Sequence, residues 1–373
     1  MTPMFDQQLC EELVMQLAAT PGPSLNEGPR IACIAGFLNS HRVACTTDSA
    51  GSLWAFFGPD DWPGTIVLDA HIDVVGQGVA HHVQRSENKI IGAGVFDDLA
   101  AAALLMLLAV RLSHSTVDTP IAIVFSVGEE GLGNLKGMRR MVADRPRPPR
   151  LLISFDMSPA EYSVAALGSV RYRVSFKGAG GHSWGDFGRA SATEELVDFL
   201  AAVKAGYRHA AADAATPVSY NIGTLRGGEG INCISRAADA EFEFRSASPG
   251  TLAAMTGLLN DTIEMHKACG CEIGLEIIGE RPAVMAPRDT WYERLVLETW
   301  TLNGVAPRDV CRSTNINVPL AHGWPALCVG LARGGNVHRE DEFLLVDSLT
   351  EGWTLLNRLI GAMAPQRQKE SRA

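Results

Sequence analysis

The sequence predicts an α/β protein in which a mostly parallel β-sheet is covered by helices and a smaller β-α-β-β-α-β unit is inserted. Three observations predict this fold. The length of 373 residues suggests two or three domains. Short apolar runs alternate with helical patterns in the first half of the chain. From about residue 170 to 280, several runs instead alternate between apolar and polar residues, which is typical of half-buried strands.

Three nearly continuous apolar runs predict the buried strands of the large sheet. They are residues 65–70 (TIVLDA), 120–127 (PIAIVFSV) and 151–155 (LLISF). Residues 99–112 lie between the first two runs and are rich in alanine and leucine, the strongest helix formers. Strands without alternation, together with a helix that is apolar on most sides, indicate burial inside a large domain.

The inserted unit is predicted from the order of the later elements. Strand-like and helical runs follow one another at residues 171–178, 191–207, 217–225, 239–246, 248–268 and 271–280. The order β-α-β-β-α-β is that of a ferredoxin-like sandwich. The α/β pattern then returns, with a helix at 289–302, a strand at 326–331 and a helix at 347–363. We therefore predict one domain from residues 1–166 and 283–373, and a second domain from residues 167–282.

Charge and composition narrow the class of protein. The formal net charge is −10 and no concentrated basic patch is present, so we expect no nucleic-acid partner. The longest aliphatic run, residues 99–110, is shorter than the ~20 residues of a membrane span, so no membrane partner is expected. The N-terminus lacks a basic segment followed by an apolar one, which predicts a cytoplasmic protein. The eight cysteines are scattered and are expected to be reduced thiols.

Acidic and imidazole side chains follow each predicted strand of the large sheet at its carboxyl end. His71 and Asp73 follow the first strand, Glu129 and Glu130 the second, and Asp156 the third. Ligands of open α/β sheets bind at this edge of the sheet. We therefore expect these side chains to meet in one crevice.

Two further clusters join this set, because Asp97 and Asp98 precede the predicted helix at 99–112 and His338 follows the late strand. Carboxylates gathered in this way, without lysine or arginine in the clusters, would repel one another unless a cation compensates them. Histidine and carboxylate ligands suit zinc, cobalt or manganese, and five of them indicate two ions that share a bridging carboxylate. A single carboxylate at a strand end is more often a helix cap or a turn residue. The conjunction of several clusters favours the metal.

The motifs that contain these residues resemble the M20 family of co-catalytic metallopeptidases, which includes peptidase T-like enzymes and acyl-amino-acid amidohydrolases. In order along nearly the whole chain, they are His71-Ile-Asp73, residues 92–98 (GAGVFDD), Gly128-Glu129-Glu130, Gly181-His182-Ser183, Gly227-Gly228 with Asn232, and residues 338–342 (HREDE). Residues 131–137 (GLGNLKG) resemble the peptidase T-like members in particular.

The resemblance implies a role for each matching residue. It implies metal ligation by His71, Asp97, Glu130, Asp156 and His338, with Asp97 as the bridge between two ions. It makes Glu129 the general base and Asp73 the residue that orients the first histidine. The inserted unit corresponds to a lid and dimerisation domain. In it, His182 matches a histidine that reaches the partner subunit's site and steadies the oxyanion there. Asn232 and Arg245 match two substrate-binding groups. The resemblance also implies a cis peptide bond between Asp97 and Asp98.

The sequence departs from the family pattern at three places. Leu99 stands where a lysine is common. The stretch 313–317 (STNIN) has Asn315 in place of the usual aspartate, and because this stretch lies near the substrate pocket in the family, the charge preference there stays open. The loop after His182 reads SWGDFG, without the commoner proline.

These observations predict a binuclear metal-dependent hydrolase with two divalent ions, zinc first and cobalt or manganese as alternatives. A water shared by the ions would attack the amide of a di- or tripeptide, as in an aminopeptidase, with Glu129 as general base. An N-acyl-amino-acid deacylase of the same family is the alternative, since it needs the same ions and base. A non-catalytic relative with a regulatory or partner-binding role is a further alternative. The strand edges of the inserted unit predict a homodimer through that unit.

Overall fold

The computed structural model describes residues 5–75 and 82–363, and the chain divides into two compact units. Unit 1 comprises Met1–Ala165 and Ala286–Ala373, and unit 2 comprises Ala166–Met285. Each unit has its own cluster of buried apolar side chains. Among the helices formed by the described residues, none is long and apolar enough to cross a lipid bilayer.

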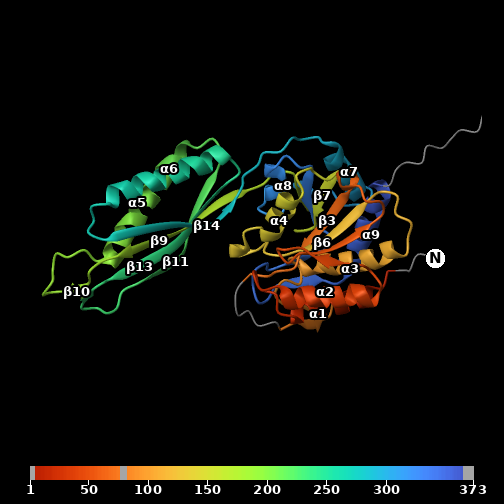
Figure 1. Cartoon of the computed structure of the whole chain (residues 1–373), viewed down its shortest axis with the longest axis horizontal. Helices are drawn as coiled ribbons and strands as arrows, with labels where there is room; N and C mark the ends of the chain where they lie inside the picture. Colours follow the sequence, from red (N-terminus) through yellow and green to blue (C-terminus); the bar gives the residue numbers. More distant parts are fainter. Residues whose placement is uncertain (1–4, 76–81, 364–373) are drawn as a thin grey trace, which may run out of the picture. The chain divides into compact units, whose positions relative to one another are not determined.

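Unit 1 is built on an eight-stranded sheet of order β1-β2-β6-β3-β7-β16-β8-β15 (Figure 1). Its strands are β1 (Thr46–Thr47), β2 (Leu53–Phe57), β3 (Ile66–His71), β6 (Ile121–Ser126), β7 (Leu151–Ser154), β8 (Glu161–Ser163), β15 (Arg308–Asp309) and β16 (Ala326–Val329). The central strands β6, β3, β7 and β16 run parallel, and β2 and β8 pair with them antiparallel. The predicted α/β fold with a large, mainly parallel sheet is confirmed.

The central strands are buried along their whole length because helices cover the sheet. The helices of unit 1 are α1 (Gln7–Ala19), α2 (Gly28–Ser40), α3 (Leu99–Ser113), α4 (Lys136–Asp144), α7 (Trp291–Thr301), α8 (Asn317–Ala321) and α9 (Asp347–Met363), with short 3-10 turns η1 (Trp62–Gly64) and η2 (Gly131–Gly133). The helix α3 packs against β2, β3 and β6, and α1, α2 and α9 pack around it.

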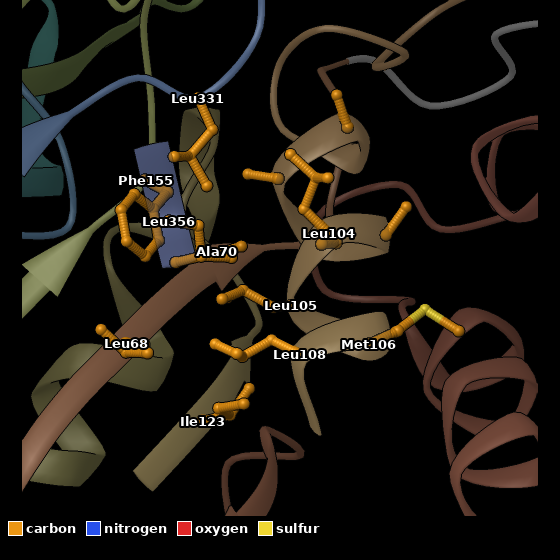
Figure 2. Close-up of a cluster of buried hydrophobic side chains, with 14 of the residues drawn as sticks. Leu68, Ala70, Leu104, Leu105, Met106, Leu108, Ile123, Phe155, Leu331 and Leu356 are labelled. Atoms are coloured by element: carbon orange, nitrogen blue, oxygen red, sulfur yellow. The ribbon is translucent and has the colours of Figure 1, made fainter. Parts of the chain in front are cut away.

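The environment of α3 explains its apolar composition. Figure 2 shows Leu105 and Leu108 of this helix pointing towards Leu68 of β3 and Ile123 of β6, while Met106 points the other way. All of these side chains are fully buried. A helix enclosed by a sheet and by other helices needs apolar residues on nearly every side, which is the pattern that its sequence has.

A second, four-stranded sheet in unit 1 has the order β17-β18-β5-β4. Its strands are β4 (Gln84–Ser86), β5 (Lys89–Ile91), β17 (Gly334–Gly335) and β18 (Phe343–Leu345). The pairing of β5 with β18 joins two segments that are distant in sequence. The loop that carries Asp97 and the turn that carries His338 are thereby brought to the same region of unit 1.

Unit 2 contains a four-stranded antiparallel sheet of order β11-β13-β9-β14. In chain order its main elements are β9 (Gly168–Lys177), α5 (Ala192–Asp213), β11 (Val218–Gly227), β13 (Ala237–Ser246), α6 (Pro249–His266) and β14 (Glu272–Arg281). Every second residue of β13 is buried, and the helices α5 and α6 pack against this sheet. Two short strands, β10 (Gly181–His182) and β12 (Cys233–Ile234), form a separate antiparallel pair.

Candidate metal centre

The carboxyl ends of three neighbouring parallel strands position the first group of site residues. His71 is the last residue of β3, Glu129 and Glu130 follow β6, and Asp156 follows β7. The order β6-β3-β7 in the sheet places these ends beside one another. The edge of the sheet that the sequence indicated is therefore the place where these side chains gather, as open α/β sheets require.

Asp97 and His338 complete this cluster. The His71 Nε2 atom lies 2.8 Å from Asp97 Oδ1, and the His338 Nε2 atom lies 2.8 Å from Glu130 Oε1. A distance of 3.4 Å separates His338 Nε2 from Asp97 Oδ2. Asp97 thus contacts both histidines, one through each carboxylate oxygen. The peptide bond between Asp97 and Asp98 is cis.

Three overlapping groups of donor atoms have the spacing of a metal site, with all atoms of a group within 4.8 Å of one another. The groups are His71 with Asp97 and Asp156, Asp97 with Glu130 and His338, and His71 with Glu129 and Glu130. Asp97 belongs to the first two groups, which share no other residue. This arrangement has the form of two adjoining sites that meet at one carboxylate.

The charges of the cluster favour a bound cation. No lysine or arginine of the described segments forms an ion pair with Asp97, Glu130 or Asp156. Burial, followed by the nearby charge of Asp97, raises the pKa of Asp156 to about 7. Hydrogen bonds to Asp97 and Glu130 raise the pKa of His338 to about 10. Carboxylates and imidazoles that compete for protons in this way are a suitable nitrogen and oxygen donor set for a divalent metal.

Asp73 connects two of the strand ends. Its carboxylate accepts hydrogen bonds from the main-chain N–H groups of Glu129 (3.0 Å) and Glu130 (2.9 Å). The His71 Nδ1 atom lies 3.1 Å from the main-chain oxygen of Asp73 and 3.6 Å from its carboxylate. The His71 ring nitrogen therefore lies closer to the main-chain oxygen of Asp73 than to its carboxylate, while that carboxylate binds the main chain of Glu129 and Glu130.

Sequence reasoning missed the residues that hold these loops from behind. The Ser24 Oγ atom donates to the Asp73 carboxylate (2.8 Å), and Glu27 accepts from the main-chain N–H of Gly128 (2.9 Å). The buried guanidinium of Arg30 donates to the main-chain oxygen of Ile72. The sequence gives only a weak signal for these residues. Ser24 and Glu27 stand just before α2, where a serine or a carboxylate usually indicates an N-cap.

Two departures from the family pattern prove to be buried. Leu99 packs in the apolar core of unit 1. Asn315 is 1% exposed, and its side-chain amide donates to Asp69 (2.9 Å) and to Ser126 (2.9 Å). Burial raises the pKa of Asp69. Asn315 therefore belongs to a polar network behind the strand ends.

His182 and Asn232 lie together in unit 2. His182 pairs with Cys233 across the β10–β12 ladder, and the Ser183 N–H donates to the Asn232 main-chain oxygen (3.0 Å). The His182 Nδ1 atom accepts from the N–H groups of Trp184 and Gly185, each at 3.2 Å. An Nδ1 atom that accepts hydrogen bonds places the ring proton of the neutral imidazole on Nε2. His182 is therefore arranged as a hydrogen-bond donor.

Arg245 lies at the other end of unit 2. It is the cross-strand neighbour of Ser169 near the start of β9, and its Nε atom is 2.6 Å from Glu243 Oε1. The chain runs from β12 directly into β13, whose first residue, Ala237, pairs with Lys177 at the end of β9. Eight residues of strand separate Ala237 from Arg245, which is roughly 26 Å at ~3.3 Å per residue. Within one copy, Arg245 is therefore not brought together with His182 and Asn232.

The fold and this cluster define the class of protein: an α/β protein with a candidate metal centre at the carboxyl edge of its main sheet. The chain belongs to peptidase family M20/M25/M40, whose family model matches residues 67–362. The resemblance stated from the motifs is confirmed. Among curated proteins, it is 26% identical over 218 residues to a "Probable carboxypeptidase" of Ajellomyces dermatitidis, covering 54% of this chain. It is 25% identical over 242 residues to a protein of that name from Ajellomyces capsulatus, covering 60% of this chain.

The matched stretches span about half the length of these curated relatives, 50% and 54% respectively. Solved structures resemble the chain over nearly its whole length. A tripeptidase from Staphylococcus aureus has a TM-score of 0.79 at 17% identity, covering 98% of this chain and all (100%) of that one. The aminopeptidase PepT from Bacillus cereus has a TM-score of 0.74 at 18% identity, covering 97% and 100%. At these identities the likeness shows a shared fold.

Proposed function

We propose that the chain is a two-metal hydrolase of small peptides. The observation that carries the proposal is the pair of donor groups that share Asp97. His71 and Asp156 would complete the site of one ion, and Glu130 and His338 the site of the other. Zinc is the first candidate for this donor set, and cobalt or manganese are the alternatives. When bound, the two ions would polarise the scissile carbonyl and lower the pKa of a water molecule towards neutrality.

Glu129 is the proposed general base. Its carboxylate lies within 4.8 Å of donor atoms of His71 and Glu130, and the side chain is nearly fully buried. The bond from its main-chain N–H to Asp73 holds its backbone in place. Glu129 would take a proton from the attacking water and deliver it to the leaving amine, a role that typically contributes ~10²–10⁴-fold to the rate.

His182 and Asn232 are the proposed contacts to the substrate from unit 2. The two N–H bonds at Nδ1 leave the Nε2–H of His182 free to donate to the oxyanion that forms on the substrate carbonyl. Arg245, beside Ser169, is the proposed partner of a substrate carboxylate at the opposite end of the unit.

The separation of these groups supports a homodimer. Arg245 lies roughly 26 Å along β13 from Ala237, which begins that strand three residues after β12, the partner of the His182 strand. A single small substrate therefore cannot contact both His182 and Arg245 in one copy. Two copies of the chain would remove this conflict, with His182 acting on the partner subunit's site. Mixing two inactive variants, Glu129→Gln and His182→Ala, tests the idea, because hybrid dimers contain one complete site and regain activity. A mixture that forms hybrids and stays inactive would contradict the shared site.

The substrate class is proposed from the peptide-hydrolysing relatives. Structures that resemble the chain include a tripeptidase and an aminopeptidase, which favours small peptides with a free amino terminus. A deacylase of N-acyl amino acids is the second candidate, since an amidase of the hydantoinase/carbamoylase family from Burkholderia vietnamiensis also shares the fold, with a TM-score of 0.72 and 16% identity. A panel of di- and tripeptides against N-acetyl and N-succinyl amino acids separates the two.

The test of the mechanism combines metal removal with one substitution. Chelation should abolish turnover of peptides, and reloading with zinc, cobalt or manganese should restore it. Glu129→Gln should keep the wild-type metal content and lose turnover by about 10²-fold or more. A chain that binds no metal after reloading would instead favour the non-catalytic relative, and normal turnover in Glu129→Gln would remove Glu129 from its proposed role.

A further inference from the structure

The side chain of Glu342 forms an unusual set of bonds next to the candidate metal centre. Glu342 directly precedes β18 and is 2% exposed. Its Oε1 atom accepts from the main-chain N–H groups of Phe96 (2.9 Å) and Asp97 (3.0 Å), and its Oε2 atom accepts from Gly94 (3.0 Å). Its main-chain oxygen accepts from Gly92 (2.9 Å). One residue thus makes four hydrogen bonds to the loop that carries Asp97.

The loop depends on these bonds because it belongs to no helix or strand. Buried main-chain N–H groups need an acceptor, and a carboxylate that accepts several of them forms stronger bonds than a neutral group. The loop is also closely packed, since Gly94 has a φ of +78° and a Cβ atom there would lie 2.2 Å from Val74 Cγ1. Little room is left for the loop to rearrange if its acceptor is lost.

Glu342 also belongs to the turn that carries His338. Its N–H donates to the Arg339 main-chain oxygen (3.2 Å), and the Asn336 side chain donates to the Asp341 carboxylate (2.9 Å). These bonds hold residues 336–342 in a compact turn. The side chain of Glu342 therefore couples the position of His338 to that of Asp97.

We propose that Glu342 is a positioning residue that holds the Asp97 carboxylate and the His338 imidazole at the separation a divalent ion needs. The inference rests on the proposed two-metal function. Glu342 lines the same cavity as Asp97, Glu130 and His338, which measures about 70 Å³. Its two oxygens already accept three N–H bonds, which argues for a role behind the ligands and against direct ligation.

The test is Glu342→Gln in the full chain, with zinc affinity measured by competition against a chelating dye. Glutamine has the shape of glutamate, but an NH₂ group replaces one of the two carboxylate oxygens. The loop offers only N–H donors to this side chain, so at least one hydrogen bond is lost. Loss of a partner that orients metal ligands typically lowers metal affinity 10–100-fold, and we expect a loss of about that size. Glu351→Gln is the matched control, because Glu351 is exposed and pairs with Arg333 (2.9 Å). The zinc affinity of this control variant should equal that of the wild type.

Two further variants separate positioning from general destabilisation. If Glu342 acts through Asp97, Asp97→Asn combined with Glu342→Gln should bind zinc no more weakly than Asp97→Asn alone. Should Glu342→Gln fail to fold, Glu342→Asp keeps the charge, withdraws the oxygens by one methylene and should show the same loss. A folded variant with an affinity within twofold of the wild type would overturn the inference, as would losses that simply add. A wild-type chain that binds no zinc would instead refute the proposed function.

Discussion

Replacing Arg30 by methionine tests whether the segment behind the strand ends supports the structure of unit 1. Arg30 is the buried residue of α2 whose guanidinium donates to three main-chain oxygens, those of Thr20, Gly22 and Ile72. The fit is close, because a Cβ atom on Gly22 would lie 2.8 Å from the Arg30 guanidinium. Methionine fills a similar volume and has no donor.

The expected loss follows from the oxygens that methionine leaves without their donor. Each buried acceptor without a partner costs roughly 1–3 kcal/mol, and at least two of the three oxygens lose their partner. Removing the charge offsets part of this cost, since burial lowers the pKa of Arg30 to about 10 and the buried guanidinium is itself unfavourable. We expect the free energy of unfolding to fall by about 2–4 kcal/mol. Arg30→Lys keeps the charge with fewer donor directions and should lose less.

Urea unfolding followed by tryptophan fluorescence measures this loss, because every tryptophan except Trp184 lies in unit 1. The control is Arg140→Met, since Arg140 is exposed and its ion pair with Asp144 should contribute no more than about 1 kcal/mol. The reasoning is refuted if Arg30→Met unfolds at the same urea concentration as Arg140→Met. The same variant should also bind zinc more weakly, because Ile72 lies between His71 and Asp73.

Four further substitutions test the packing of unit 1 by thermal unfolding of the metal-free chain. Gly352→Ala should destabilise the folded chain by about 1–3 kcal/mol, because the added Cβ would lie 2.2 Å from a main-chain oxygen. Gly361→Ala in the same helix meets no atom within 4 Å and should stabilise the folded chain by roughly 0.5–1 kcal/mol. Equal melting temperatures of the two variants would contradict both predictions. Leu104→Ala removes a fully buried side chain of α3 and should cost about 2–5 kcal/mol, and a loss below 1 kcal/mol would mean that the helix is not enclosed. Asn315→Asp would put a second carboxylate against Asp69 and should cost about 3–5 kcal/mol near neutral pH, an effect that should shrink in acid.

The main elements of the large sheet could be predicted because their side chains carry the signal themselves. The strand β7 and the helix α9 begin at the predicted residues, Leu151 and Asp347, since a buried strand needs an apolar run and a half-buried helix needs an apolar stripe. The helix α2 was not predicted. It begins Gly28-Pro29, which in sequence resembles a turn, although proline fits the first turn of a helix.

The ligand candidates could be found for a topological reason, and their supports could not. A parallel sheet brings the ends of its strands to one edge, so His71, Glu130 and Asp156 are neighbours whenever their strands are. The supports come from contacts that no local pattern encodes. Ser24 lies 49 residues from Asp73, and Glu27 lies 101 residues from Gly128. Only the packing of α2 and of the segment before it within unit 1 brings them together.

Asn315 shows how burial changes the meaning of a departure from a family pattern. In sequence, an asparagine in place of an aspartate suggests a change in the charge offered to a substrate. In the structure, both hydrogen-bond partners of its amide nitrogen, Asp69 and Ser126, are themselves fully buried. Asp69 also accepts from Ser154 (2.8 Å), so the carboxylate of this network lies on β3, and an aspartate at 315 would add a second buried charge beside it. The asparagine is therefore explained by the buried polar network around Asp69, to which its side-chain amide donates.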